Sequence, residues 1–310
     1  FNSQEIQMKK KNIFIAILLL ALLLISCGGG SGPVEEASED APPAPEVEAV
    51  ASVSVAPEVT TETEATAPNF DPQPPEGQRM QFETSDGTAL IGYYYPASVP
   101  NAPIVVLMHW AGGDQTDWQK NGVIDWLQNR GGGSGAQSLS QQSVVYPPMP
   151  ESVSFAVFTF DFRGFGESSG KFDRSGGLLD AKSAYEFAKR LEDVDPTRMA
   201  GIGSSIGSDG VVDGCADGCL GAFSFSPGSY LTLSYADEVK RLDDEGKPVT
   251  CVASEGDSTS ASTCNGATGE NYKSVIYAGT AHGDELLQQP NVPEGLGQLI
   301  LDWLLLAFGV

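Results

Sequence analysis

The stretch RMAGIGSSIG, residues 198–207, carries the pattern that decides the fold. The part from Arg198 to Gly203 predicts a buried strand, and it runs directly into the pentapeptide Gly203-Ser204-Ser205-Ile206-Gly207. A Gly-x-Ser-x-Gly turn between a strand and a helix pushes the central hydroxyl outward, and its glycines leave room for neighbouring backbone. We therefore expect Ser205 to be a nucleophile at the end of a central strand.

The chain around this turn alternates short apolar runs with longer amphipathic segments. This alternation is typical of strands and helices in a largely parallel sheet, so the fold class is α/β. Without the leader and linker expected over 1–68, about 240 residues remain, which suits one catalytic domain over 69–310. We expect an opening hairpin at 80–83 and 89–95, strands at 104–109, 154–160, 198–203, 221–225, 249–253 and 274–277, helices at 118–129, 176–191 and 296–308, and an inserted loop without an assigned role at 131–150.

A serine hydroxyl is a poor nucleophile at neutral pH and needs an adjacent base, usually a histidine that a carboxylate orients. The chain has two histidines. His109 precedes Ser205 and ends an expected buried strand, whereas His282 follows it. The chain order serine, acid, histidine therefore selects His282 as the base.

The acid is expected in a loop directly after a strand, between Ser205 and His282. The stretch Ser254-Glu255-Gly256-Asp257 follows the strand expected at 249–253 and offers two carboxylates. Asp257 is preferred because the preceding glycine permits a sharp turn, and Glu255 stays the alternative. Asp284, two residues beyond His282, is expected on the surface.

A tetrahedral oxyanion needs fixed N–H donors, one of them from the residue after the nucleophile, here Ile206. The second donor is expected in the loop after an early strand, where His109-Trp110-Ala111-Gly112-Gly113 stands. By position Ala111 is the donor and Trp110 is the alternative. Trp110 could equally pack against the core or line an acyl pocket, and so could the segment 226–247.

These motifs together resemble the α/β-hydrolase superfamily over about residues 80–308, nearest to its dienelactone-hydrolase-like and small bacterial serine esterase members. The resemblance also rests on the segments 161–168, Asp-Phe-Arg-Gly-Phe-Gly-Glu-Ser, and 279–283, Gly-Thr-Ala-His-Gly. It implies a monomeric hydrolase of small-molecule esters that uses no cofactor or metal, and a structural role for Arg163. The alternatives are a peptidase or amidase with the same triad, and a non-catalytic binding lipoprotein that retains the fold.

The beginning of the sequence predicts an exported, lipid-anchored protein of the bacterial cell envelope. We expect translation to start at Met8, where three lysines precede an apolar run over 13–25. Such a run is typical of a signal peptide and is short for a membrane-spanning helix. It ends in Leu24-Ile25-Ser26-Cys27, which resembles a lipobox, so residues 1–26 are expected to be removed and Cys27 to carry the lipid.

Amino-acid composition predicts the character of the segment after Cys27 and argues against one class of binding partner. Residues 27–68 are rich in Ala, Pro, Glu and Thr and contain too few large apolar side chains for a core, so a disordered acidic linker is predicted. The whole chain carries 41 acidic and 17 basic residues, a net charge of -24. A surface of that sign repels phosphate backbones, which argues against nucleic acid as a partner.

Four cysteines remain besides Cys27, an even number that suggests disulfides in an exported protein. The preferred pairs are Cys215 with Cys219 and Cys251 with Cys264, because each closes a short polar loop. A zinc site at Cys-x3-Cys is the weaker alternative, since no further histidine or thiolate lies nearby in sequence.

Overall fold

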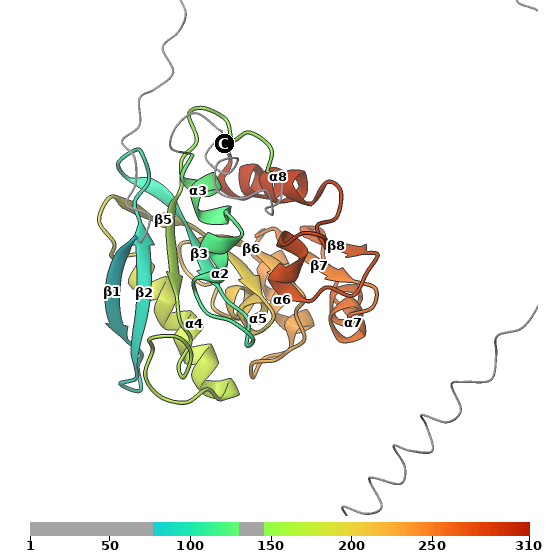
Figure 1. Cartoon of the computed structure of the whole chain (residues 1–310), viewed down its shortest axis with the longest axis horizontal. Coiled ribbons are helices and arrows are strands. Elements are labelled where there is room, and N and C mark those ends of the chain that lie inside the picture. The colour runs from blue at the N-terminus through green and yellow to red at the C-terminus, as the bar shows by residue number, and fades with distance from the viewer. Residues whose placement is uncertain (1–76, 130–145) are drawn as a thin grey trace, which may run out of the picture. The chain divides into compact units, whose positions relative to one another are not determined.

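The computed structural model describes residues 77–129 and 146–310, which contain an eight-stranded, mostly parallel sheet (Figure 1). The order across the sheet is β1-β2-β4-β3-β5-β6-β7-β8. β1 and β2 pair antiparallel, β2 pairs antiparallel with β4, and every pairing from β4 to β8 is parallel. The strands are β1 Gln78–Glu83, β2 Ala89–Tyr95, β3 Ala102–Met108, β4 Ala156–Phe160, β5 Val194–Ser204, β6 Cys219–Phe225, β7 Val249–Ser254 and β8 Tyr272–Tyr277.

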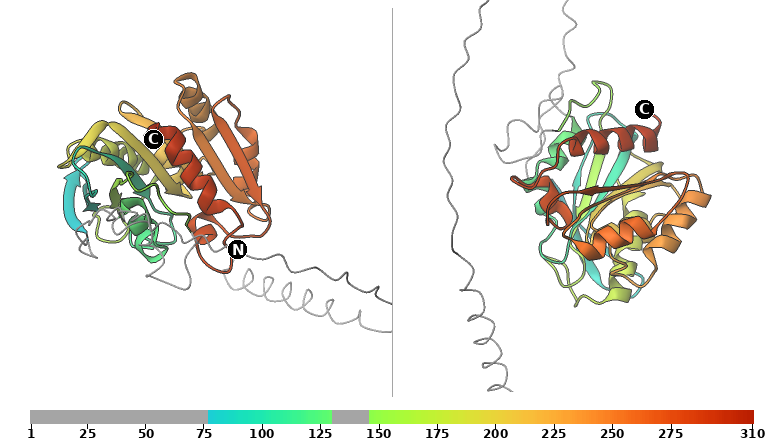
Figure 2. Two further views of the ribbon diagram at one scale, coloured as in Figure 1. Left: turned by 90° about the horizontal axis from the view of Figure 1, so that it is seen from above. Right: turned by 90° about the vertical axis from the view of Figure 1, so that its right-hand side faces the viewer.

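Helices cover both faces of the sheet (Figure 2). A separate cluster of buried apolar side chains lies under each layer of helices. One layer holds α4 Arg174–Ala188, α5 Ile206–Asp213, α6 Tyr235–Asp244 and α7 Ser258–Gly266. The other holds α2 Asp117–Lys120, α3 Val123–Gln128, the 3-10 helix η2 Gly283–Leu287 and α8 Leu296–Phe308. Because both faces are covered, every residue of β3 and β4 is buried, which explains their nearly continuous apolar sequences.

The α/β class and the expected strands are confirmed, but residues 118–129 do not form one helix. The chain forms α2 and α3 instead, separated at Asn121 and Gly122. Gly122 has φ 78°, a left-handed conformation that a continuous right-handed helix excludes. The segment 226–247 contains both a loop and the helix α6, whose Tyr235, Val239 and Leu242 pack on the core.

Several sequence predictions concern residues outside the described ranges. These are the signal peptide, Cys27 and the acidic linker, together with most of the inserted loop at 131–150. In residues 77–129 and 146–310, the longest helices are too short or too polar to cross a membrane.

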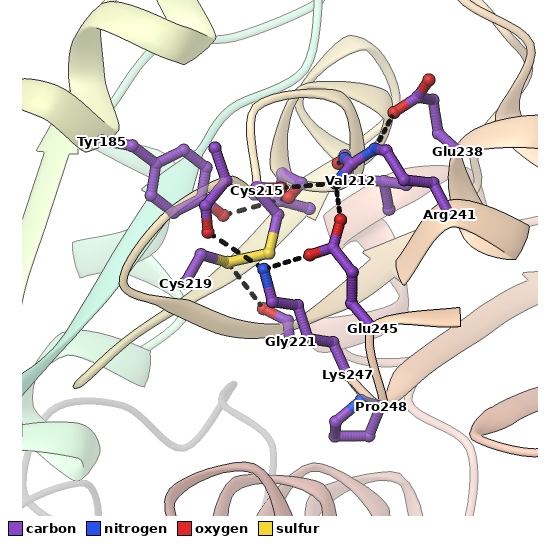
Figure 3. Close-up of a disulfide and its surroundings, with 12 residues drawn as sticks. Tyr185, Val212, Cys215, Cys219, Gly221, Glu238, Arg241, Glu245, Lys247 and Pro248 are labelled. Carbon is purple, nitrogen blue, oxygen red and sulfur yellow. Dashed lines mark hydrogen bonds and ion pairs between the residues drawn. A yellow bond between two sulfur atoms is a disulfide. The ribbon is translucent and has the colours of Figure 1, made fainter. Parts of the chain in front are cut away.

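Two disulfides join the preferred pairs, Cys215 with Cys219 and Cys251 with Cys264. The first follows the end of α5 directly, where Arg241 of α6 donates hydrogen bonds to the carbonyls of Val212 and Cys215 (Figure 3). These carbonyls belong to the last turn and the exit of the helix, which lack intrahelical donors. The far end of α5 is thereby fixed, and its other end begins next to Ser205.

Candidate active site

Ser205 lies in a sharp turn between β5 and α5, with φ 53°, a value that non-glycine residues seldom adopt. The glycines on either side are required by close backbone contacts. A Cβ on Gly203 would lie 2.0 Å from the carbonyl oxygen of Gly207, and a Cβ on Gly207 would lie 2.1 Å from that of Met108. The Gly-x-Ser-x-Gly pattern thus permits a strained turn that presents the serine hydroxyl at the carboxyl end of the sheet.

The structure brings Ser205, His282 and Asp257 into one hydrogen-bonded chain. Nε2 of His282 lies 2.8 Å from Oγ of Ser205, and Nδ1 lies 2.7 Å from Oδ2 of Asp257. Asp257 follows β7 and precedes α7, whereas the exposed Glu255 donates its amide to Tyr277 and makes no contact with His282. Of the two carboxylates that the sequence offered, Asp257 therefore meets the imidazole.

The environment of the three side chains favours an ionised carboxylate beside a solvent-accessible imidazole. Burial alone would raise the pKa of Asp257, but hydrogen bonds from His282 and Ser260 outweigh it and lower this pKa. The side chain of His282 is 28% exposed, and Ser205 is 6% exposed. Substrate can thus reach an imidazole whose Nδ1 is held by a negative charge.

The expected oxyanion donors lie at the end of β3 and at the start of α5. Ile206 is the first residue of α5, so its amide has no partner within the helix. In the described part of the chain, the amides of Ile206, Trp110 and Ala111 donate no hydrogen bond to a backbone carbonyl. Both alternatives for the second donor therefore remain available.

His109 is fully buried and joins two loops rather than serving as a base. Its Nδ1 lies 2.7 Å from the carbonyl oxygen of Trp110, and its Nε2 accepts the amide of Phe162 at 3.0 Å. A ring that donates at one nitrogen and accepts at the other is neutral, and burial lowers the pKa of His109 in agreement with this. His109 thereby fixes the loop that contains Trp110 and Ala111.

Two aromatic rings flank the imidazole of His282. The Trp110 ring has its centroid 6.2 Å away and donates its indole N–H to Asp117, while the Tyr230 ring lies 6.3 Å away in an edge-on arrangement. The loop before α6 therefore contributes to the site. The position of Trp110 fits a wall of the site better than a residue packed in the core.

The loop 226–231, which carries Tyr230, is held from two sides. The buried carboxylate of Asp209 on α5 accepts the amides of Gly228, Tyr230 and Leu231, and the guanidinium of Arg174 on α4 donates to carbonyls of the same loop. Burial raises the pKa of Asp209 to about 6 in spite of these amide donors. Sequence reasoning missed Asp209, whose signal was an acidic residue in the first turn of a short, glycine-rich helix.

The prediction that Asp284 is exposed was wrong. Asp284 is 1% exposed, and its Oδ1 accepts a hydrogen bond from Oγ of Ser204 at 2.9 Å. Its second carboxylate oxygen, Oδ2, accepts from the side chain of Gln288 at 3.2 Å. Acidic side chains are usually exposed unless they find such partners, and one of the two partners, Ser204 at the end of β5, lies 80 positions away, where the local sequence does not reveal it.

Arg163 lies apart from the triad and connects two other parts of the chain. Its guanidinium contacts Asp180 on α4 at 2.8 Å and Asp86 in the β1–β2 turn at 2.8 Å. This placement fits the structural role expected for it. Over residues 77–129 and 146–310, no group of three or more His, Cys, Asp or Glu side chains is arranged to hold a metal ion.

Two uncharacterized bacterial proteins are among the relatives to which the chain is similar. No family model matches it. It is 30% identical over 148 residues to the uncharacterized protein YfhR of Escherichia coli. The matched stretch covers 46% of this chain and 43% of YfhR. It is 26% identical over 235 residues to the uncharacterized protein Rv2307c of Mycobacterium tuberculosis, or 69% of this chain and 75% of that protein. The match therefore spans less than half the length of YfhR.

The solved structures define the fold. The Pyrococcus furiosus esterase Pf2001 superposes with a TM-score of 0.53 at 15% identity, over 75% of this chain and 91% of the esterase. The α/β hydrolase GrgF of Penicillium superposes with a TM-score of 0.54 at 13% identity, over 75% of this chain and 99% of GrgF. Identities this low speak for architecture alone. With its sheet order, its strained serine turn and these superpositions, the chain has the α/β-hydrolase fold.

Proposed function

We propose that this protein is a serine hydrolase that cleaves carboxylic esters of small molecules. The observation that carries the proposal is the hydrogen-bonded chain from Ser205 through His282 to Asp257, next to amides that donate no backbone hydrogen bond among the described residues. A nucleophile, its base and the group that orients the base are the parts that acyl transfer requires. The likeness to a fold that includes an esterase supports the choice of reaction.

The geometry accounts for each step of ester hydrolysis. His282 accepts the proton of Ser205 at Nε2 while the hydroxyl oxygen attacks the ester carbonyl, and Asp257 stabilises the resulting imidazolium through Nδ1. The amide of Ile206 and that of Ala111 or Trp110 bind the oxyanion. His282 then protonates the leaving alcohol. In the second half, His282 takes a proton from a water molecule that attacks the acyl-enzyme carbonyl, and it returns this proton to Oγ of Ser205 as the bond between Oγ and the acyl carbon breaks and the carboxylic acid leaves.

Activity-based labelling separates this proposal from its rivals. The purified protein, Ser205→Ala and His282→Ala are each incubated with a fluorophosphonate probe and, separately, with p-nitrophenyl acetate. Labelling and turnover by the wild type that both vanish in the two variants would support a serine esterase. Labelling without ester turnover would favour a peptidase or amidase, and a folded wild type that shows neither would favour a non-catalytic binding protein.

The two candidate acids form a matched pair of variants. Asp257→Asn should lower kcat by about 10⁴-fold, the magnitude seen when a triad aspartate is replaced by its amide. Glu255→Gln should leave kcat unchanged because Glu255 does not touch His282. Equal losses in both variants would contradict the assignment of Asp257.

We also propose that the protein is exported and anchored to the bacterial cell envelope by a lipid on Cys27. The support is the order of the lysines, the apolar run and Ser26-Cys27 in the sequence. Metabolic labelling with an alkyne fatty acid tests this proposal. The wild type should take up the label and partition with membranes, Cys27→Ser should do neither, and label in Cys27→Ser would refute the site.

A further inference from the structure

Two hydrogen bonds join Ser204, which precedes Ser205, to Asp284, which lies in the segment after His282. Oγ of Ser204 donates to Oδ1 of Asp284 at 2.9 Å, and the amide of Asp284 donates to the same hydroxyl oxygen at 2.9 Å. Both residues are buried, at 0% and 1% exposure. The two hydrogen bonds join residues that lie 80 positions apart in the sequence.

The position of this pair relative to the reacting atoms is specific. Ser204 directly precedes Ser205 at the end of β5, and Asp284 lies two residues after His282. Between His282 and Asp284 the chain turns at Gly283, which has φ 62°, and a Cβ there would lie 2.2 Å from Oγ of Ser204. The backbone at Gly283 therefore lies in close contact with the side chain of Ser204.

We propose that Ser204 and Asp284 form a clamp that sets the distance between Oγ of Ser205 and Nε2 of His282. Asp284 is a positioning residue in this scheme, since it touches no reacting atom and acts through Ser204 and through its own loop. The inference rests on the proposed hydrolase function. It assigns a role to two side chains that the proposed mechanism does not use.

The burial of Asp284 supports a specific role. Burial, with Asp117 nearby as a further contribution, raises the pKa of Asp284 to about 6. A carboxylate in such surroundings is costly unless hydrogen bonds satisfy it, and a well-packed apolar residue would cost less. Ser204 and Gln288 provide those hydrogen bonds, so the carboxylate is held at a defined place beside the nucleophile turn.

A second contact completes the immobilisation of the base. The neighbouring Glu285 accepts the backbone amide of His282 at 2.9 Å, and Asp257 holds Nδ1 of the ring. Glu285 and Asp257 fix His282 itself, but neither connects it to the strand that carries Ser205. Apart from the hydrogen bond between Ser205 and His282 themselves, the Ser204–Asp284 pair makes this connection through side-chain hydrogen bonds among the described residues.

The test uses Ser204→Ala, Asp284→Ala, Asp284→Asn and the double variant Ser204→Ala/Asp284→Ala, assayed for kcat, KM and the rate of fluorophosphonate labelling. A misplacement of about 1 Å can cost about 100-fold in rate, so Asp284→Ala should lower kcat by up to about that factor with KM nearly unchanged. Asp284→Asn should recover most of the loss, because its amide oxygen can still accept from Ser204. The double variant should be no slower than the slower single variant, since both changes remove the same contact.

Asp213→Asn is the matched control, because it also removes a buried carboxylate of raised pKa but one without a contact to the triad. It should keep wild-type kcat. The clamp is refuted if folded Ser204→Ala and Asp284→Ala both turn over at the wild-type rate, if Asp284→Asn is as slow as Asp284→Ala, or if the double variant shows additive losses. Should Asp284→Ala fail to fold, Ser204→Ala decides, since it removes the same hydrogen bond and wild-type turnover by it would refute the clamp. A folded wild type that neither labels nor hydrolyses esters would instead refute the proposed function, and the clamp with it.

Discussion

The ring of Tyr230 lies edge-on to the imidazole of His282, with the two centroids 6.3 Å apart at an interplanar angle of 74°. Tyr230 belongs to the loop between β6 and α6, and His282 follows β8, the last strand in the sheet order. Their contact therefore depends on how the loop with Tyr230 is held. Asp209 and Arg174 hold it through its backbone. The placement of Tyr230 beside His282 therefore depends on two residues, Asp209 and Arg174, that make no hydrogen bond to Ser205, His282 or Asp257.

Tyr230→Ala should lower kcat/KM for p-nitrophenyl acetate by between about 2-fold and 10-fold, since an aromatic pair contributes about 0.5–1.5 kcal/mol beyond its area burial. Tyr230→Phe should stay near wild type, because it keeps the ring and loses a hydroxyl that lies 3.5 Å from Ser260. Steady-state kinetics of both variants check this. A larger loss in Tyr230→Phe than in Tyr230→Ala would show that the hydroxyl matters and the ring does not.

Asp209→Ala should destabilise the fold and weaken catalysis together. It leaves the amides of Gly228, Tyr230 and Leu231 without their acceptor, and each buried unsatisfied group costs about 1–3 kcal/mol. The freed loop should displace Tyr230, so kcat/KM should fall at least as far as in Tyr230→Ala. Urea denaturation and kinetics measure the two effects, with Asp209→Asn as a milder variant that keeps one acceptor oxygen. Wild-type kinetics in a destabilised Asp209→Ala would break the link between the loop and the site.

Asp213 should make the protein less stable as pH rises. Burial, with Asp209 and Glu238 nearby, raises the pKa of Asp213 to about 8, and among the described residues neither carboxylate oxygen has a hydrogen-bond partner. The unfolded chain loses this proton at about pH 4, so the folded state is favoured most below that pH and loses stability up to about pH 8.

Asp213→Asn removes this titration. The variant should therefore unfold at higher urea concentration than the wild type at pH 8, and the difference in unfolding free energy should shrink toward pH 5. Urea titrations at the two pH values measure it. A difference that is the same at both would mean that the carboxylate does not titrate in the fold.

The Cys251–Cys264 disulfide should contribute more to the free energy of unfolding than the Cys215–Cys219 disulfide. It closes a separation of 13 residues against 4, and a loop of that size contributes about 3 kcal/mol by restricting the unfolded chain. It also encloses Asp257, so its loss should lower kcat as well. Paired alanine variants of each bridge, compared by chemical denaturation and ester turnover, test the ranking. Equal losses of stability and no loss of kcat would contradict it.

The sheet and the serine turn were predictable because their signals are local. Continuous apolar runs identify the buried strands, and the spacing of Gly203 and Gly207 around Ser205 reflects contacts within a few residues and with one neighbouring strand. The single helix expected at 118–129 failed because amphipathic spacing does not report the left-handed conformation of Gly122.

The surroundings of the site were not predictable in the same way. Whether Asp257 or Glu255 turns toward His282 depends on how the chain leaves β7, and two residues of one loop look alike in sequence. Asp284 was assigned to the surface because acidic residues are mostly exposed, and its partner Ser204 lies 80 positions away. Such pairs are created by the tertiary fold.

Because His109 is buried, the two histidines should differ in their reactivity toward reagents in solution. Of the two imidazoles in the chain, His109 has no exposed surface and has both ring nitrogens in hydrogen bonds, whereas His282 is open to solvent. A reagent that acylates imidazole, such as diethyl pyrocarbonate, should therefore modify one histidine of the native protein. Modification by such a reagent therefore reports on His282 alone, with no need to replace His109 first.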